Sequence, residues 1–68
     1  MNLLDYYGRK VEILAKDGKL YKGVAAYYFE PEENENNKES IAVTKLYSRN
    51  PPFWEFYESD IVSIKIVD

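Results

Sequence analysis

The sequence predicts one all-β domain over residues 1–68, a small, five-stranded, strongly bent barrel with a short N-terminal helix. Five short runs are rich in β-branched and aromatic residues, and turn-forming residues separate them. A glycine lies inside the longest run, where a small barrel needs a sharp bend. A chain of 68 residues has room for one domain only.

The N-terminal part is predicted to form a short helix over residues 2–7. Asn2 is a suitable N-cap, and Gly8 is a suitable residue to end the helix. The first strand follows over residues 11–15, where apolar side chains recur at every second position and therefore share one face.

The first hairpin is predicted at Asp17-Gly18, because Asp-Gly is the strongest short hairpin signal. The strand that follows, over residues 20–29, is long, and Gly23 is its expected bending point. We therefore assign structural roles to three glycines, Gly8, Gly18 and Gly23.

The second half contains an acidic loop and three further strands. Residues 30–39 hold five glutamates and one lysine, a net charge of −4 within a chain of net charge −3, and predict a solvated loop. The remaining elements are expected to be strands over 40–47, 53–57 and 61–67, a proline-containing turn over 48–52 and a tight turn over 58–60.

The composition argues against catalysis and against metal binding. The chain has no histidine and no cysteine, so it lacks the commonest general base, the commonest metal ligand and any disulfide. We expect a protein that is not an enzyme and binds no cofactor and no metal. Small domains without disulfides or a bound metal often gain stability by oligomerisation, so we also expect a partner chain.

No segment predicts export or membrane insertion. Met1 is followed by Asn2 and Asp5 instead of a basic region and a long apolar run, and no apolar stretch approaches the roughly 20 residues of a membrane span. We therefore expect a soluble, cytoplasmic protein without a membrane partner.

Two segments of the first half carry a resemblance to a known family. Residues 7–13 contain Gly-Arg-Lys-Val-Glu-Ile, and residues 17–24 contain a hairpin glycine followed by Tyr-Lys-Gly-Val. With the preceding helix, their order and spacing resemble the first motif of the Sm-like (LSm) family, in a divergent, bacterial-type form. Residues 60–64 resemble the last strand of that family.

The resemblance implies a short helix on a bent five-stranded barrel and assembly into rings, in which the fourth strand of one subunit pairs with the fifth of the next. It also implies binding of single-stranded RNA. The family usually has Arg-Gly where this chain has Tyr57-Glu58, and a glutamate repels a phosphate backbone. A protein partner is therefore favoured over RNA.

Candidate contact residues follow from these expectations. The candidate interface comprises Phe53, Trp54, Phe56, Tyr57, Ile61 and Val62 of the last two strands. The candidate RNA contacts are Tyr28, Asn34, Asn36 and Tyr57. Three functions stay open: an oligomeric interaction module with a protein partner, an Sm-like binder of single-stranded RNA, and a monomeric SH3-like barrel that binds a peptide on its aromatic side chains. For the aromatic residues of the fourth strand and of positions 27–29, packing in the core or in a subunit contact is the competing explanation.

Overall fold

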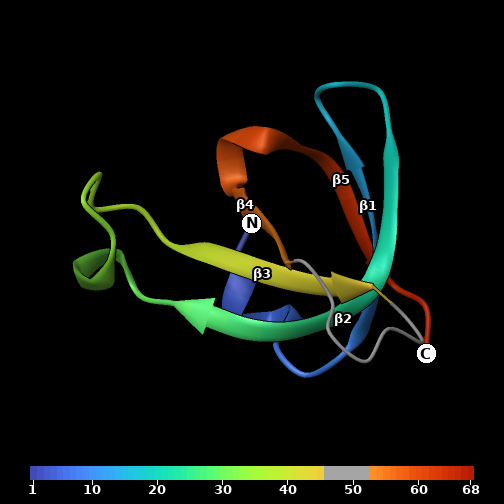
Figure 1. Cartoon of the computed structure of the whole chain (residues 1–68), viewed down its shortest axis with the longest axis horizontal. Helices are drawn as coiled ribbons and strands as arrows, with labels where there is room; N and C mark the ends of the chain where they lie inside the picture. The colour runs from blue at the N-terminus through green and yellow to red at the C-terminus, as the bar shows by residue number, and fades with distance from the viewer. Residues whose placement is uncertain (46–52) are drawn as a thin grey trace.

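The fold is a single antiparallel sheet of five strands, seen here in a computed structural model that describes residues 1–45 and 53–68. The strands follow the order β4-β3-β2-β1-β5 across the sheet (Figure 1). Their bounds are β1 Lys10–Ala15, β2 Leu20–Phe29, β3 Ser40–Lys45, β4 Phe53–Tyr57 and β5 Ile61–Ile66. The prediction of a small all-β fold with five strands is confirmed. The predicted turn over 48–52 and the end of the strand predicted over 40–47 lie outside the described residues.

The helices within the described ranges are three short 3₁₀ turns, η1 Leu3–Tyr6, η2 Pro31–Glu33 and η3 Glu58–Asp60. The tight turn predicted over 58–60 is confirmed. The predicted N-terminal helix is shorter and tighter than an α-helix, although Asn2 caps it by accepting a hydrogen bond from the Leu4 amide at 3.2 Å. Leu3 of this turn is buried and Tyr6 packs partly buried against the same core, because residues three apart lie on one side of a 3₁₀ turn.

The sheet bends where β2 changes partners. The first part of β2 pairs with β1 up to Val24, and the part from Gly23 onward pairs with β3. Figure 1 shows the sharp curve of β2 that results. A Cβ atom placed on Gly23 would lie 1.8 Å from the carbonyl oxygen of Thr44, so the two backbones approach too closely for any side chain there.

The sheet is not closed, and this corrects the prediction of a barrel. Strand β5 pairs with β1 and β4 pairs with β3, but β4 and β5 do not pair with each other. The sheet is therefore open between β4 and β5. Against the core, the ring of Tyr21 on β2 lies 5.0 Å from Trp54 and 5.2 Å from Phe56 of β4, edge to face in both cases. The opening leaves one side of β4 and one side of β5 without a neighbouring strand in the described part of the chain.

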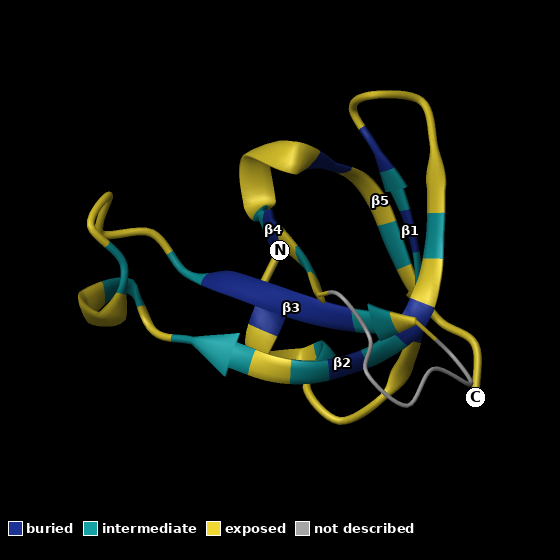
Figure 2. Ribbon diagram, viewed as in Figure 1, coloured by how far each residue is buried: buried dark blue, intermediate teal, exposed yellow. Residues whose placement is uncertain are grey.

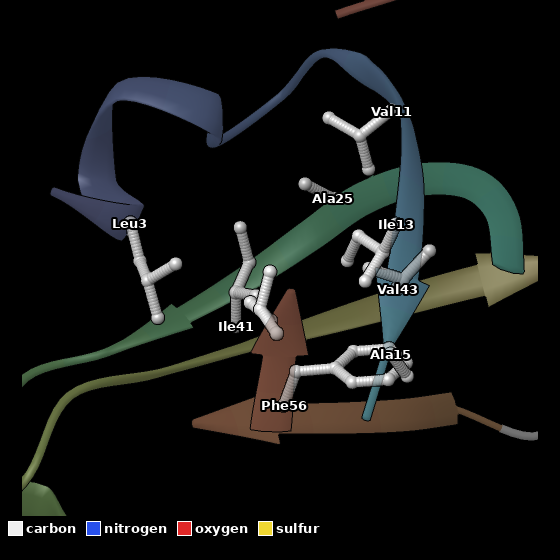
Figure 3. Packing of buried hydrophobic residues seen from close by; sticks show 9 residues of the cluster. Leu3, Val11, Ile13, Ala15, Ala25, Ile41, Val43 and Phe56 are labelled. Carbon is white, nitrogen blue, oxygen red and sulfur yellow. The ribbon is translucent and has the colours of Figure 1, made fainter. Parts of the chain in front are cut away.

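The core fills the concave side of the bent sheet (Figure 3). Alternate residues of β1 are buried, as their spacing predicts, and β3 is buried along most of its length, whereas β5 is mostly exposed (Figure 2). The core cluster comprises Leu3, Val11, Ile13, Ala15, Ala25, Ile41, Val43, Phe56 and Ile61.

Two β-bulges shift the alternation of side chains. In β2, Ala25 pairs with Val43 and Tyr27 with Ala42, so Ala26 is the extra residue. In β5, Ser63 pairs with Leu14 and Ile61 with Ala15, so Val62 is the extra residue. Because a bulge reverses which side chains face inward beyond it, a strict period of two fails at both places.

We predict that the substitution Gly23→Ala unfolds the domain or lowers its free energy of unfolding by at least about 3 kcal/mol, because the added methyl group has to displace a backbone carbonyl. Urea denaturation followed by circular dichroism measures the effect. The control is Gly18→Ala, where the space is open and only the positive φ of 84° opposes the change, at a cost of roughly 1–2 kcal/mol. Equal losses of the free energy of unfolding in Gly23→Ala and Gly18→Ala would contradict the close approach of Gly23 to the Thr44 carbonyl.

Candidate functional site

The first candidate surface is the backbone edge of β5. The Val67 amide donates to the Lys10 carbonyl at 2.9 Å, which makes Lys10 and Val67 a hydrogen-bonded pair of the ladder between β1 and β5. Hydrogen-bonded and non-hydrogen-bonded pairs alternate along an antiparallel ladder. The pairs of Ile64 with Ile13 and of Ile66 with Val11 are therefore non-hydrogen-bonded, and the amide and carbonyl groups of Ile64 and Ile66 point away from β1. Such groups form a template on which another strand can pair.

The six residues of the candidate interface differ in burial. Phe56 and Ile61 belong to the core, with 6% of each residue exposed, so only their backbones can take part in a contact. Trp54 and Tyr57 are half-buried, and Trp54 packs against the same core. The exposed members are Phe53 and Val62, at 52% and 58%.

Val62 owes its exposure to the bulge in β5. The regular alternation predicts one shared face for Val62, Ile64 and Ile66, but Val62 is the extra residue and turns outward. Ile64 packs against the core, and Ile66 remains 40% exposed. The edge of β5 therefore carries two exposed apolar side chains beside its outward-pointing backbone groups.

The second candidate surface is a shallow hollow of about 330 Å³ on the convex side of β2, β3 and β4. We call it the outer hollow, and it is lined by Tyr27, Phe29, Ala42, Phe53 and Glu55. The centroid of the Tyr27 ring lies 5.0 Å from that of Phe53, edge to face, and 6.5 Å from that of Phe29, with nearly parallel planes. Ala42 pairs with both Tyr27 and Glu55, and its small side chain leaves the space between these larger neighbours.

Sequence reasoning recognised the aromatic run at positions 27–29 but not the surface that it forms. The bulge at Ala26 turns Tyr28 towards the core and Tyr27 outward, where it is 49% exposed. Bulges have no reliable signature in a single sequence, so the pairing of β2 with β3 was needed to find this surface.

Glu55 is held at the hollow by a chain of hydrogen bonds. The hydroxyl of Ser40, which is fully buried, donates to Glu55 Oε2 at 2.7 Å. The side-chain amide of Asn34 in turn donates to Ser40 Oγ at 3.1 Å and to the Lys38 carbonyl at 2.7 Å. These bonds fix one oxygen of the Glu55 carboxylate.

The candidate RNA contacts are engaged within the protein. Asn34 makes the two bonds just described, and the side chain of Asn36 accepts from the Lys38 amide at 3.1 Å. The hydroxyl of Tyr28 donates to Glu39 Oε2 at 2.6 Å. Tyr28 packs against the core, whereas Tyr57 lies one register position further along, where Ser40 separates it from Phe29. Because neighbouring positions face opposite sides of a sheet, the four residues do not form one common surface.

The pair of Tyr28 and Glu39 is the most strongly perturbed acid–base pair of the described residues. The hydrogen bond to Glu39, aided by burial, raises the pKa of Tyr28 to about 12. The same bond, together with that from the Leu3 amide at 2.9 Å, lowers the pKa of Glu39. Glu39 thus connects η1 to β2, which is a structural role.

A larger open hollow, of about 550 Å³, lies between the acidic loop and η3. Its lining residues are Pro31, Asn37, Lys38, Glu39, Glu58 and Ser59. The carboxylate of Glu39 already accepts two hydrogen bonds, and that of Glu58 lies 3.6 Å from the N-terminal ammonium group. This hollow therefore presents carboxylates that have partners, and it contains no aromatic side chain.

Neither a metal site nor a membrane span is found in the described ranges. Residues 1–45 and 53–68 contain no group of three or more metal-ligating side chains. Within the same ranges, no helix is long and apolar enough to cross a bilayer.

Together, the fold and the two surfaces define a small, single-sheet, all-β protein with free strand edges and an aromatic outer surface. Comparison with models of known families, with curated proteins and with solved structures gives no match.

We predict that the contribution of the Tyr28–Glu39 hydrogen bond to the free energy of unfolding is constant over a middle range of pH and falls at both ends. Its contribution is complete below about pH 10, where an unfolded tyrosine ionises, and is lost as the pH rises through about 12. On the acid side it is complete above the ordinary pKa of a glutamate and is lost as the pH falls through the lowered pKa of Glu39.

Urea denaturation of the wild type and of Tyr28→Phe over a pH series measures this contribution as a difference between the two proteins. The difference should be constant from about pH 5 to about pH 10 and shrink on both sides. A difference that does not change up to pH 12 would contradict the bond.

Proposed function

We propose that this chain is a non-catalytic interaction module of the Sm-like type, which assembles with further copies through its strand edges and binds a protein partner. The observation that carries the proposal is the open sheet, in which β4 and β5 each have one unpaired side among the described residues. Exposed backbone edges pair readily with other strands, and natural proteins usually cover them or protect them with charge.

The side chains at the two edges suit such pairing. Phe53 on β4, and Val62 and Ile66 on β5, are at least 40% exposed, and apolar side chains at a free edge favour contact with another chain. The small size of the domain supports the same proposal, because a partner would add buried apolar surface. The resemblance of the first half to the Sm-like family implies this mode of assembly, from β4 of one copy to β5 of the next.

The monomeric, SH3-like peptide binder is the second candidate, and the outer hollow favours it. Its aromatic rings are exposed on a single chain and need no neighbouring copy. Single-stranded RNA has less support than either protein-binding role, because Tyr28, Asn34 and Asn36 are engaged internally and both asparagines belong to the loop of net charge −4.

We predict that Val62→Lys reduces the assembled mass to that of the 8.0 kDa monomer, because a charged side chain at a strand edge opposes strand pairing. Size-exclusion chromatography with light scattering, at matched concentrations of variant and wild type, measures the mass.

The matched control is Leu4→Lys. Leu4 is 50% exposed, much as Val62 is, but it lies in η1, outside the sheet. This control should assemble like the wild type. A wild-type chain that remains a monomer at high micromolar concentration contradicts the oligomer and leaves the monomeric peptide binder.

A further inference from the structure

We propose that the outer hollow binds an arginine side chain of an extended segment of the protein partner. This inference rests on the proposed function, since it specifies the chemistry of that partner. It depends on three features of the hollow: exposed aromatic rings, a carboxylate held in place, and an acidic neighbouring loop.

The aromatic rings supply the face on which a cation can lie. About half of Tyr27 and of Phe53 is exposed, and Phe29 extends the same surface along β2. The faces of aromatic rings carry partial negative charge and attract cations, while their area favours coverage by an apolar stem. An arginine side chain offers both, because three methylene groups precede the planar guanidinium group.

The carboxylate of Glu55 supplies the charge partner. Ser40 fixes its Oε2 atom, and Ser40 itself is buried and held by Asn34, so the carboxylate is oriented before any ligand arrives. An ionised carboxylate can accept about four hydrogen bonds, and the one from Ser40 leaves further capacity. No ion pair involves Glu55 within residues 1–45 and 53–68.

The surrounding charge selects a cation over an anion. Phe29 is followed directly by the segment 30–39, with its net charge of −4. Such a surface attracts cationic side chains and repels phosphate groups or an acidic peptide. Arginine suits the hollow better than lysine, because its planar group can stack on a ring and donate two parallel hydrogen bonds to one carboxylate.

The test is a titration followed by the backbone amide signals of the isotope-labelled full chain in nuclear magnetic resonance. The probe is an acetylated and amidated pentapeptide with arginine at its centre and alanine elsewhere. Its control has citrulline at the centre, which has the shape of arginine without the charge. We expect saturable shifts at Phe29, Ala42 and Glu55 with the arginine peptide and binding weaker by about tenfold with the citrulline peptide.

Two variants test the residues of the hollow. Glu55→Gln keeps an oxygen that can accept from Ser40 but removes the charge, and it should weaken binding of the arginine peptide about tenfold. Phe53→Leu keeps an apolar side chain without a ring face and should weaken binding severalfold. The matched control Glu32→Gln removes the same charge from the loop, outside the hollow, and should bind within about twofold of the wild type.

Equal binding of the arginine and citrulline peptides overturns the proposal, as does equal binding by Glu55→Gln and the wild type. Shifts at Phe29 and Ala42 that appear on concentrating the protein without peptide also overturn it, because a second copy then occupies the hollow. The same titration of Val62→Lys separates the two proposals. Arginine binding by Val62→Lys would show that the hollow acts without assembly, and arginine binding by a wild-type chain that remains a monomer would contradict only the assembly.

Discussion

The close approach of Gly23 on β2 to the Thr44 carbonyl on β3 is the constraint on which the rest of this structure depends. It lets a ten-residue strand turn sharply and pair with β1 on one part of its length and with β3 on the other. The bend brings the apolar side chains of both parts to one concave side. Without it, a flat sheet of this size would leave most of that surface in water.

The same bend determines what the sheet leaves free. It curves the sheet towards closure and brings Tyr21 of β2 against Trp54 and Phe56 of β4, but in the described part of the chain β4 and β5 stay unpaired with each other. The core therefore uses one side of the sheet, and the edges and the convex side remain available for contacts. The two proposals of edge pairing and of arginine binding use these two surfaces, which share only β4.

Local patterns in the sequence were sufficient to predict the strands. Alternating apolar residues, the Asp-Gly hairpin and the glycine within the longest run located all five strands, and the bounds of β2 and β4 agree with the structure. The N-terminal turn was less predictable, since Asn2 signals a helix start without saying whether an α-helix or a 3₁₀ turn follows.

The surfaces were harder to predict, for a physical reason. The bulges at Ala26 and Val62 depend on how strands pair, and pairing is a property of residues far apart in the sequence. Each bulge changed the side on which neighbouring residues lie, so Tyr27 became part of the outer hollow and Val62 became an exposed edge residue. Closure of the barrel likewise depends on whether the curved sheet brings β4 and β5 together, which no local pattern reveals.

The central claim is that the edge of β5 is a pairing surface, and hydrogen exchange of single amides tests it most directly. The amides of Ile64 and Ile66 point away from β1, so they have no strand partner in the described part of a single chain and gain one when another strand pairs there. The account predicts that protection of these two amides increases as the protein is concentrated from micromolar to millimolar, while the Val67 amide, already bonded to β1, changes little. Exchange of Ile64 and Ile66 that is independent of concentration would contradict it.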